Sequence, residues 1–146
     1  MLATTDPVRS ARILLTVTAA EFFGPIVRDS GVSHLMNPFW DGHARVHLVG
    51  LMGLMGTSGL VNLYLLWLRK PRDVRDVHLA AVLQCCNLAG FWIAYFLCPL
   101  YVGVIAVPGI HVKIFGWDEN VFGFSVFTAI IATAIGFLIR ARRAQP

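Results

Sequence analysis

Four long apolar segments constrain this chain more than any other feature, and they run over residues 8–27, 44–68, 77–101 and 121–139. A helix needs about 20 mostly apolar residues to cross the hydrocarbon core of a bilayer. Only 14% of the 146 residues are charged, whereas a soluble globular protein carries about 25%. We therefore predict an all-α integral membrane protein, with residues 1–146 forming a single transmembrane domain built as a four-helix bundle.

The basic residues are divided unevenly between the two sides that such helices define. Nine of the twelve lie at the start of the first segment, between the second and the third or after the fourth: Arg9, Arg12, Arg69, Lys70, Arg72, Arg75, Arg140, Arg142 and Arg143. Only Arg28, Arg45 and Lys113 fall on the other side. Basic loops stay on the cytoplasmic side of a membrane. We therefore expect a multi-pass protein of the cell membrane with both termini in the cytoplasm, and no nucleic-acid partner.

Small and amide residues interrupt the second and third segments. Glycine recurs along the second segment at Gly50, Gly53, Gly56 and Gly59. Small residues allow helix backbones to approach closely in lipid, so we predict a tight helix–helix contact here, with room for a ligand as the alternative. The amides Asn62, Gln84 and Asn87 fall at membrane depth, where we expect hydrogen bonds between helices or, as the alternative, a pocket lining.

Four candidate catalytic residues surround the start of the second segment. His43 and His47 are four residues apart and share one face of a helix, and Asp41 also suits an N-cap. Glu21 and His47 both lie roughly 6–9 Å below the outer boundary at 1.5 Å per residue. A lone intramembrane carboxylate is costly and needs a partner. Contact between antiparallel helices would pair it with His47, with His43 and Arg45 as the other candidate partners. We take Glu21, His47, His43 and Asp41 as catalytic candidates.

Other polar and aromatic side chains on the same side are candidates for substrate binding: Trp40, Trp92, Tyr95 and Asn120. Each also has a structural interpretation. Trp40 fits an interfacial anchor, and Trp92 and Tyr95 fit packed or lipid-facing aromatics. Asn120 follows Asp118, which fits the N-cap of the fourth helix. Both interpretations stay open for all four residues.

Glutamate and histidine at one depth suit general acid–base catalysis, and aromatic rings can stabilise a developing positive charge. The leading hypothesis is an intramembrane isomerase or cyclase acting on a lipophilic molecule such as an isoprenoid, sterol or polyketide. It requires no cofactor and no metal, and its partners are the substrate, membrane lipids and a second copy of the chain. One alternative is a non-enzymatic lipid- or sterol-binding protein or small carrier. The other is a metal- or haem-binding protein in which His43 and His47 chelate one ion, completed by Glu21, His34 or His111.

The sequence N-P-F-W-D-G-H-A-R-V-H over residues 37–47 resembles a motif of small four-helix membrane proteins of bacteria and fungi. The arrangement of four spans, cytoplasmic termini and intramembrane acids is similar to that of the emopamil-binding-protein-like superfamily of sterol isomerases and ligand-binding relatives. It also resembles the integral membrane terpene cyclases, which have more helices. The second and third resemblances concern layout, so they carry over no catalytic residue. They imply acid–base chemistry on a hydrophobic molecule.

Overall fold

The computed structural model describes residues 6–106, 109 and 111–144, and its main elements are helices. The five α-helices are α1 (Asp6–Thr18), α2 (Ala20–Asp29), α3 (Gly42–Leu63), α4 (Val74–Leu97) and α5 (Glu119–Arg143). A π-helical turn, Tyr64–Leu68, extends α3, and a 3-10 turn, Cys98–Tyr101, extends α4 and contains Pro99. Two short strands, β1 (Lys113–Ile114) and β2 (Trp117–Asp118), form an antiparallel hairpin before α5.

Within the described residues these elements make four spans, each long and apolar enough to cross a membrane: Asp6–Asp29, Gly42–Leu68, Val74–Tyr101 and Glu119–Arg143. They contain the four predicted segments and extend a few residues beyond them. Large apolar side chains cover their outer surface, including Leu54, Leu60 and Ile93, which are all more than half exposed. An apolar surface of this extent indicates a membrane protein.

Aspartate side chains begin three of the helices. Asp41 accepts a hydrogen bond from the Ala44 N–H at 2.8 Å, and Asp118 accepts one from the Asn120 N–H at 2.9 Å. Asp73 begins α4 in the same way. These side chains satisfy amide groups that lack partners within the helix. The N-cap interpretation is therefore confirmed for Asp41 and Asp118.

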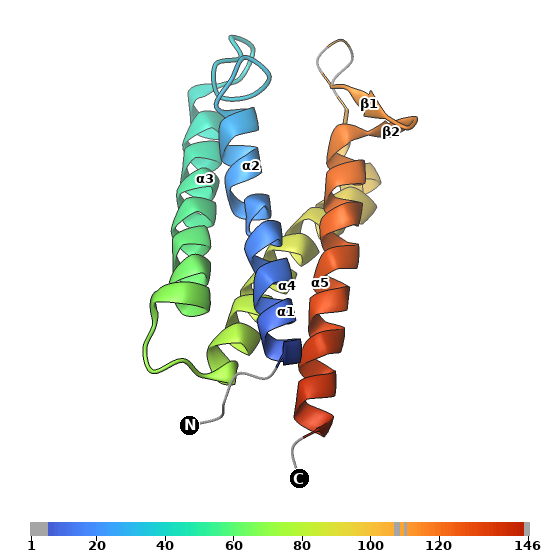
Figure 1. Cartoon of the computed structure of the whole chain (residues 1–146). Coiled ribbons are helices and arrows are strands. Elements are labelled where there is room, and N and C mark those ends of the chain that lie inside the picture. Colours follow the sequence, from blue (N-terminus) through green and yellow to red (C-terminus); the bar gives the residue numbers. More distant parts are fainter. Residues whose placement is uncertain (1–5, 107–108, 110, 145–146) are drawn as a thin grey trace.

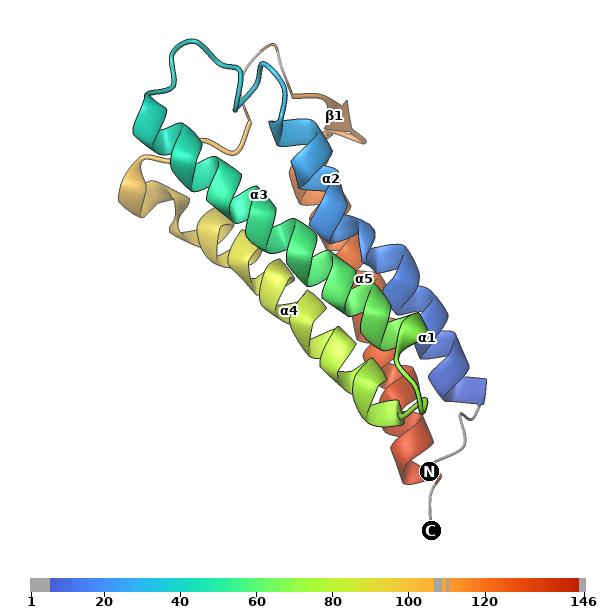
Figure 2. The same cartoon turned by 90° about the vertical axis from the view of Figure 1, so that its left-hand side faces the viewer.

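The start of α1, the connection between α3 and α4 and the end of α5 lie together at one end of the bundle (Figures 1 and 2). We call this the basic end, because the nine clustered Lys and Arg residues belong to these segments. Arg12 lies inside α1 and is buried. Its guanidinium carbon is 5.6 Å from the centroid of a Trp67 ring. The aromatic ring thus compensates part of the cost of burying this charge.

The first span bends between α1 and α2, where Ala19 interrupts the helix. Pro25 contributes to the bend, because its nitrogen carries no hydrogen for the Glu21 carbonyl and its ring crowds that oxygen. Near the basic end α1 packs against α5, but beyond the bend α2 packs mainly against α3. Figure 1 shows α2 and α5 moving apart toward the opposite end. The bend therefore opens the bundle at that end.

A chain of hydrogen bonds connects three spans at mid-depth. The Thr18 hydroxyl donates to Gln84 Oε1 at 2.6 Å. Gln84 Nε2 donates to the Leu15 carbonyl at 2.6 Å and to Asn62 Oδ1 at 3.0 Å. Asn62 Nδ2 in turn donates to the Ala80 carbonyl at 2.8 Å. The prediction of interhelical hydrogen bonds is confirmed for Asn62 and Gln84.

The glycine stripe of α3 makes a close helix contact over only half its length. A Cβ atom added at Gly59 would lie 2.6 Å from Phe23 Cζ, and one at Gly56 would lie 3.2 Å from Ile26 Cδ1. At Gly50 and Gly53 an added Cβ would meet nothing within 4 Å. The predicted tight contact is confirmed where α3 meets α2, and it is absent toward the Gly42 end.

Candidate functional site

A cavity of about 520 Å³ lies at the end opposite the basic end, among α2, α3, α4, α5 and the loop before α5. We call it the outer cavity. Its polar lining consists of Arg28, Asp29, His34, His111, Glu119 and Asn120, with Asn87 from α4. Its apolar lining includes Leu51, Met55, Phe91, Phe124 and Phe127. Cavities of this size accommodate small organic molecules, which they orient with a few polar groups.

Glycine residues, which have no side chain, account for much of the open volume. Gly24 of α2, Gly90 of α4 and Gly123 of α5 all line the outer cavity, and a Cβ at any of them would meet no atom within 4 Å. The rings of Phe91 and Phe124 stack with their centroids 3.9 Å apart. Three helices thus contribute space, while the aromatic rings form a flat apolar wall.

An ion pair joins the two sides of the opening between α2 and α5. Arg28, near the end of α2, donates from Nη2 and Nε to Oε1 of Glu119, at 2.7 and 3.1 Å. Glu119 is the first residue of α5. The pair therefore links helices that diverge at this end of the bundle. Next to Arg28, the Asp29 carboxylate lies 3.4 Å from Nδ1 of His34.

His111 is the side chain in the outer cavity best arranged for proton transfer. Its Nδ1 lies 3.2 Å from Oδ2 of Asp118 and 3.4 Å from Nδ2 of Asn120. The shorter contact, with a carboxylate, favours the tautomer that carries hydrogen on Nδ1. Its Nε2 is buried and has no hydrogen-bond partner in the described part of the chain. An imidazole held in this way can accept a proton at Nε2 while the carboxylate stabilises the resulting charge.

Glu21 lies one helical turn from the cavity residue Gly24 and is completely buried. Neither of its carboxylate oxygens has a hydrogen-bond partner among the described residues, and neither has the Asn87 Nδ2. The Asn87 amide is close enough to influence this carboxyl group, although the pair does not reach hydrogen-bond geometry. Asn87 also lines the outer cavity, which agrees with its alternative interpretation as a pocket residue.

The predicted contact between Glu21 and His47 is wrong. These two residues form no ion pair or hydrogen bond, because Glu21 points into the bundle whereas His47 is exposed on α3. The actual partner of His47 is His43, and their Nε2 atoms are 3.0 Å apart. Neither histidine lines the outer cavity, and nor does Asp41, which caps α3.

Of the four candidate substrate-binding residues, only Asn120 lines the outer cavity. Trp92 donates from Nε1 to the Thr128 hydroxyl at 3.0 Å and so joins α4 to α5. Tyr95 packs against Trp92 and its aromatic neighbours on α4. Trp40 makes an edge contact with the His34 ring. The packing interpretation thus describes Trp92 and Tyr95, and the aromatic wall of the cavity is made of phenylalanines instead.

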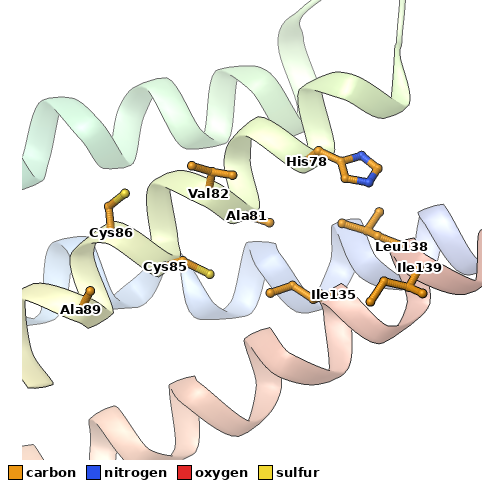
Figure 3. Close-up of a pocket in the computed structure, with 9 residues that line it drawn as sticks. All are labelled: His78, Ala81, Val82, Cys85, Cys86, Ala89, Ile135, Leu138 and Ile139. Carbon is orange, nitrogen blue, oxygen red and sulfur yellow. The ribbon is translucent and has the colours of Figure 1, made fainter. Parts of the chain in front are cut away.

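A second hollow, of about 380 Å³, lies between α4 and α5 toward the basic end. Figure 3 shows that it is lined by small and apolar side chains of both helices, with Cys85 and Cys86 on one side. His78 is the most polar residue in its lining. The Nδ1 atom of His78 already contacts the Val74 carbonyl oxygen at 2.9 Å. This hollow therefore offers little chemistry, and the outer cavity is the better candidate site.

The described residues contain no group of three or more His, Cys, Asp or Glu side chains placed to share one metal ion. The predicted set of His43 and His47 completed by Glu21, His34 or His111 is therefore not assembled. His34 and His111 do approach each other, with ring centroids 6.4 Å apart, but both belong to the outer cavity.

Three polar residues of the outer cavity were not predicted as site residues: Arg28, Asp29 and Glu119. One signal was present: Arg28 is one of only three basic residues on the side where such residues are rare. Another was the occurrence of glycine at comparable depth in three spans, at Gly24, Gly90 and Gly123. Neither signal reveals that these residues face one another.

No protein-family model, curated protein or solved structure matches this chain. The geometry of the outer cavity is therefore the basis for a proposed function.

Proposed function

We propose that this chain is a multi-pass enzyme of the cell membrane that catalyses proton transfer on a lipophilic molecule bound in the outer cavity. The reaction class is isomerisation or cyclisation, and the substrate class is an isoprenoid, sterol or polyketide. Both termini face the cytoplasm, since nine of the twelve basic residues belong to the basic end. The outer cavity then opens near the non-cytoplasmic leaflet, where an apolar substrate can enter from lipid.

One observation carries this proposal: His111 lines an otherwise mostly apolar cavity with a buried, unpartnered Nε2 and a carboxylate on Nδ1. A double-bond shift removes one proton from carbon and adds one to another carbon. A single imidazole that accepts and returns the proton satisfies this balance. Asp118 holds the ring in the required tautomer and stabilises its charged form.

Glu21 is the second candidate acid or base, now without His47 as its partner. It lies near Asn87, which lines the outer cavity. Its carboxyl group lacks the partners that a buried charge requires. His43, His47 and Asp41 have no role in this version of the mechanism, because they do not line the outer cavity. Asn120 retains its predicted role in substrate binding.

The test uses solvent deuterium: the imidazolium exchanges its N–H hydrogen with water before it donates to carbon, so the product gains deuterium. The purified chain is incubated in heavy water with a total lipid extract of the source cells, and mass spectrometry then detects labelled species. We expect at least one lipid to gain deuterium with the wild type and none with His111→Gln. His78→Gln is the matched control, because His78 lies in the apolar hollow near the basic end. Equal labelling by wild type and His111→Gln would reject the mechanism.

Non-enzymatic binding of a lipid or sterol is the second candidate function. It is favoured by pairing among the polar side chains of the outer cavity: Arg28 binds Glu119, and His34 contacts Asp29. Polar side chains that are already paired with one another can orient a ligand without reacting with it. In the same experiment, a binding protein would retain one lipid through purification and leave it unlabelled.

A further inference from the structure

His43 and His47 form a compact pair outside the outer cavity. They occupy the first two turns of α3, and both side chains are exposed. Their rings are nearly perpendicular, at 87°, with centroids 4.5 Å apart. The two Nε2 atoms face each other at 3.0 Å. Because neither residue lines the outer cavity, the proposed function leaves this pair without a role.

The chemistry of this contact allows a metal ion to replace a proton. Two Nε2 atoms at hydrogen-bond distance need one hydrogen between them, so one ring donates and the other accepts. A metal ion can replace that hydrogen and bind to one side of the line between the two nitrogens, since each imidazole then offers its Nε2 lone pair. Metal binding to histidine requires the neutral ring and releases the proton.

The distance also selects the coordination geometry. With metal–nitrogen bonds of 2.0–2.1 Å, nitrogens 3.0 Å apart subtend an angle of about 95° at the metal. An angle of this size matches neighbouring positions of a square-planar or octahedral site, which Cu²⁺ and Ni²⁺ prefer. A tetrahedral zinc site has wider angles between its ligands and normally takes at least three of them from the protein.

We propose that His43 and His47 chelate one Cu²⁺ or Ni²⁺ ion through their Nε2 atoms, with Cu²⁺ bound more tightly. The order follows from the general affinity series of divalent metals for nitrogen ligands. The described residues supply no third ligand of the His, Cys, Asp or Glu type, so water or an external ligand fills the other positions. The preceding Asp41 carboxylate offsets the positive end of the α3 dipole, which would otherwise repel the ion.

The test is copper binding to the full chain in detergent, purified with an affinity tag that contains no histidine. We expect one Cu²⁺ per chain, with an electron paramagnetic resonance spectrum split by two equivalent imidazole nitrogens. His43→Gln and His47→Gln should each leave coupling to one nitrogen and weaken binding by at least about tenfold, by analogy with disturbed metal sites. Both side chains are exposed, so neither variant endangers folding.

His34→Gln and His78→Gln are the controls, and both should bind copper as the wild type does. The proposal is overturned if the His43→Gln, His47→Gln double variant keeps the wild-type affinity. It is also overturned if the wild-type spectrum shows coupling to other than two nitrogens. Nickel is tested by competition: Ni²⁺ should displace Cu²⁺ only at a large excess, and failure of any Ni²⁺ concentration to compete would limit the site to copper.

Discussion

Replacing Gly59 with alanine tests the contact between α2 and α3, which holds one wall of the outer cavity in position. The added Cβ would lie 2.6 Å from Phe23 Cζ and 2.9 Å from Phe22 Cβ. Carbon atoms pack best at about 3.5–4.0 Å, so the helices must separate by about 1 Å. The Phe22 Cβ is bonded to the backbone and cannot turn aside, and the Phe22 side chain is buried.

Overpacking of this kind costs about 1–3 kcal/mol. Alanine recovers part of this cost, since it favours a helix over glycine by up to about 1 kcal/mol. We therefore expect Gly59→Ala to lower the free energy of unfolding by about 1–2 kcal/mol. Gly53→Ala, on the same helix, meets nothing within 4 Å and should be neutral or slightly stabilising.

The assay is reversible unfolding in mixed micelles, in which a denaturing detergent is titrated and helix content is followed by circular dichroism. Gly56→Ala gives an intermediate point, because its Cβ would meet only the end of the Ile26 side chain, at 3.2 Å. The expected order of stability is Gly53→Ala, then Gly56→Ala, then Gly59→Ala. If Gly59→Ala proved as stable as Gly53→Ala, the close contact between α2 and α3 would be refuted.

Three further predictions concern the polar network, the cavity and the orientation. Gln84→Leu should cost about 2 kcal/mol in the same assay, because it removes three hydrogen bonds worth about 0.6 kcal/mol each in a membrane; Asn87→Leu, which removes none, should cost nothing, and equal losses would count against the network. Gly123→Leu should fill the outer cavity and abolish retention of a co-purifying lipid measured by mass spectrometry, whereas Gly136→Leu, on the same helix but outside the cavity, should retain it; retention by both would exclude the cavity as the binding site. A reporter fused after residue 146 should be active only in the cytoplasm, and an external signal would reverse the proposed orientation.

Properties that depend on short stretches of chain were predictable. The number and approximate limits of the spans follow from apolar length, which α5 and the other helices then confirm. The caps made by Asp41 and Asp118 depend only on residues two or three positions away. The hydrogen bonds of Gln84 and Asn62 follow from the cost of leaving a buried amide unsatisfied in lipid.

The composition of the site required the tertiary structure. The position of a residue along a helix can be counted from the sequence alone. The direction in which a side chain points around the helix axis is a different quantity. Apolar residues occur on every face of α3, so its sequence does not distinguish the face that packs inward. His47 was therefore assigned to the face that meets Glu21, whereas its side chain is exposed.

The four long apolar segments by themselves determined the helical class and the spans. The positions of Lys and Arg between these segments determined that the basic residues gather at one end. Only the tertiary structure decided that a bend at Ala19 separates α2 from α5 and that Arg28 and Glu119 bridge the opening. It also brought His111 beside Asp118 in a loop with no regular periodicity. The physical reason is that apolar burial in lipid gives little preference among helix rotations. Packing at glycines and a few polar contacts therefore determine which residues meet.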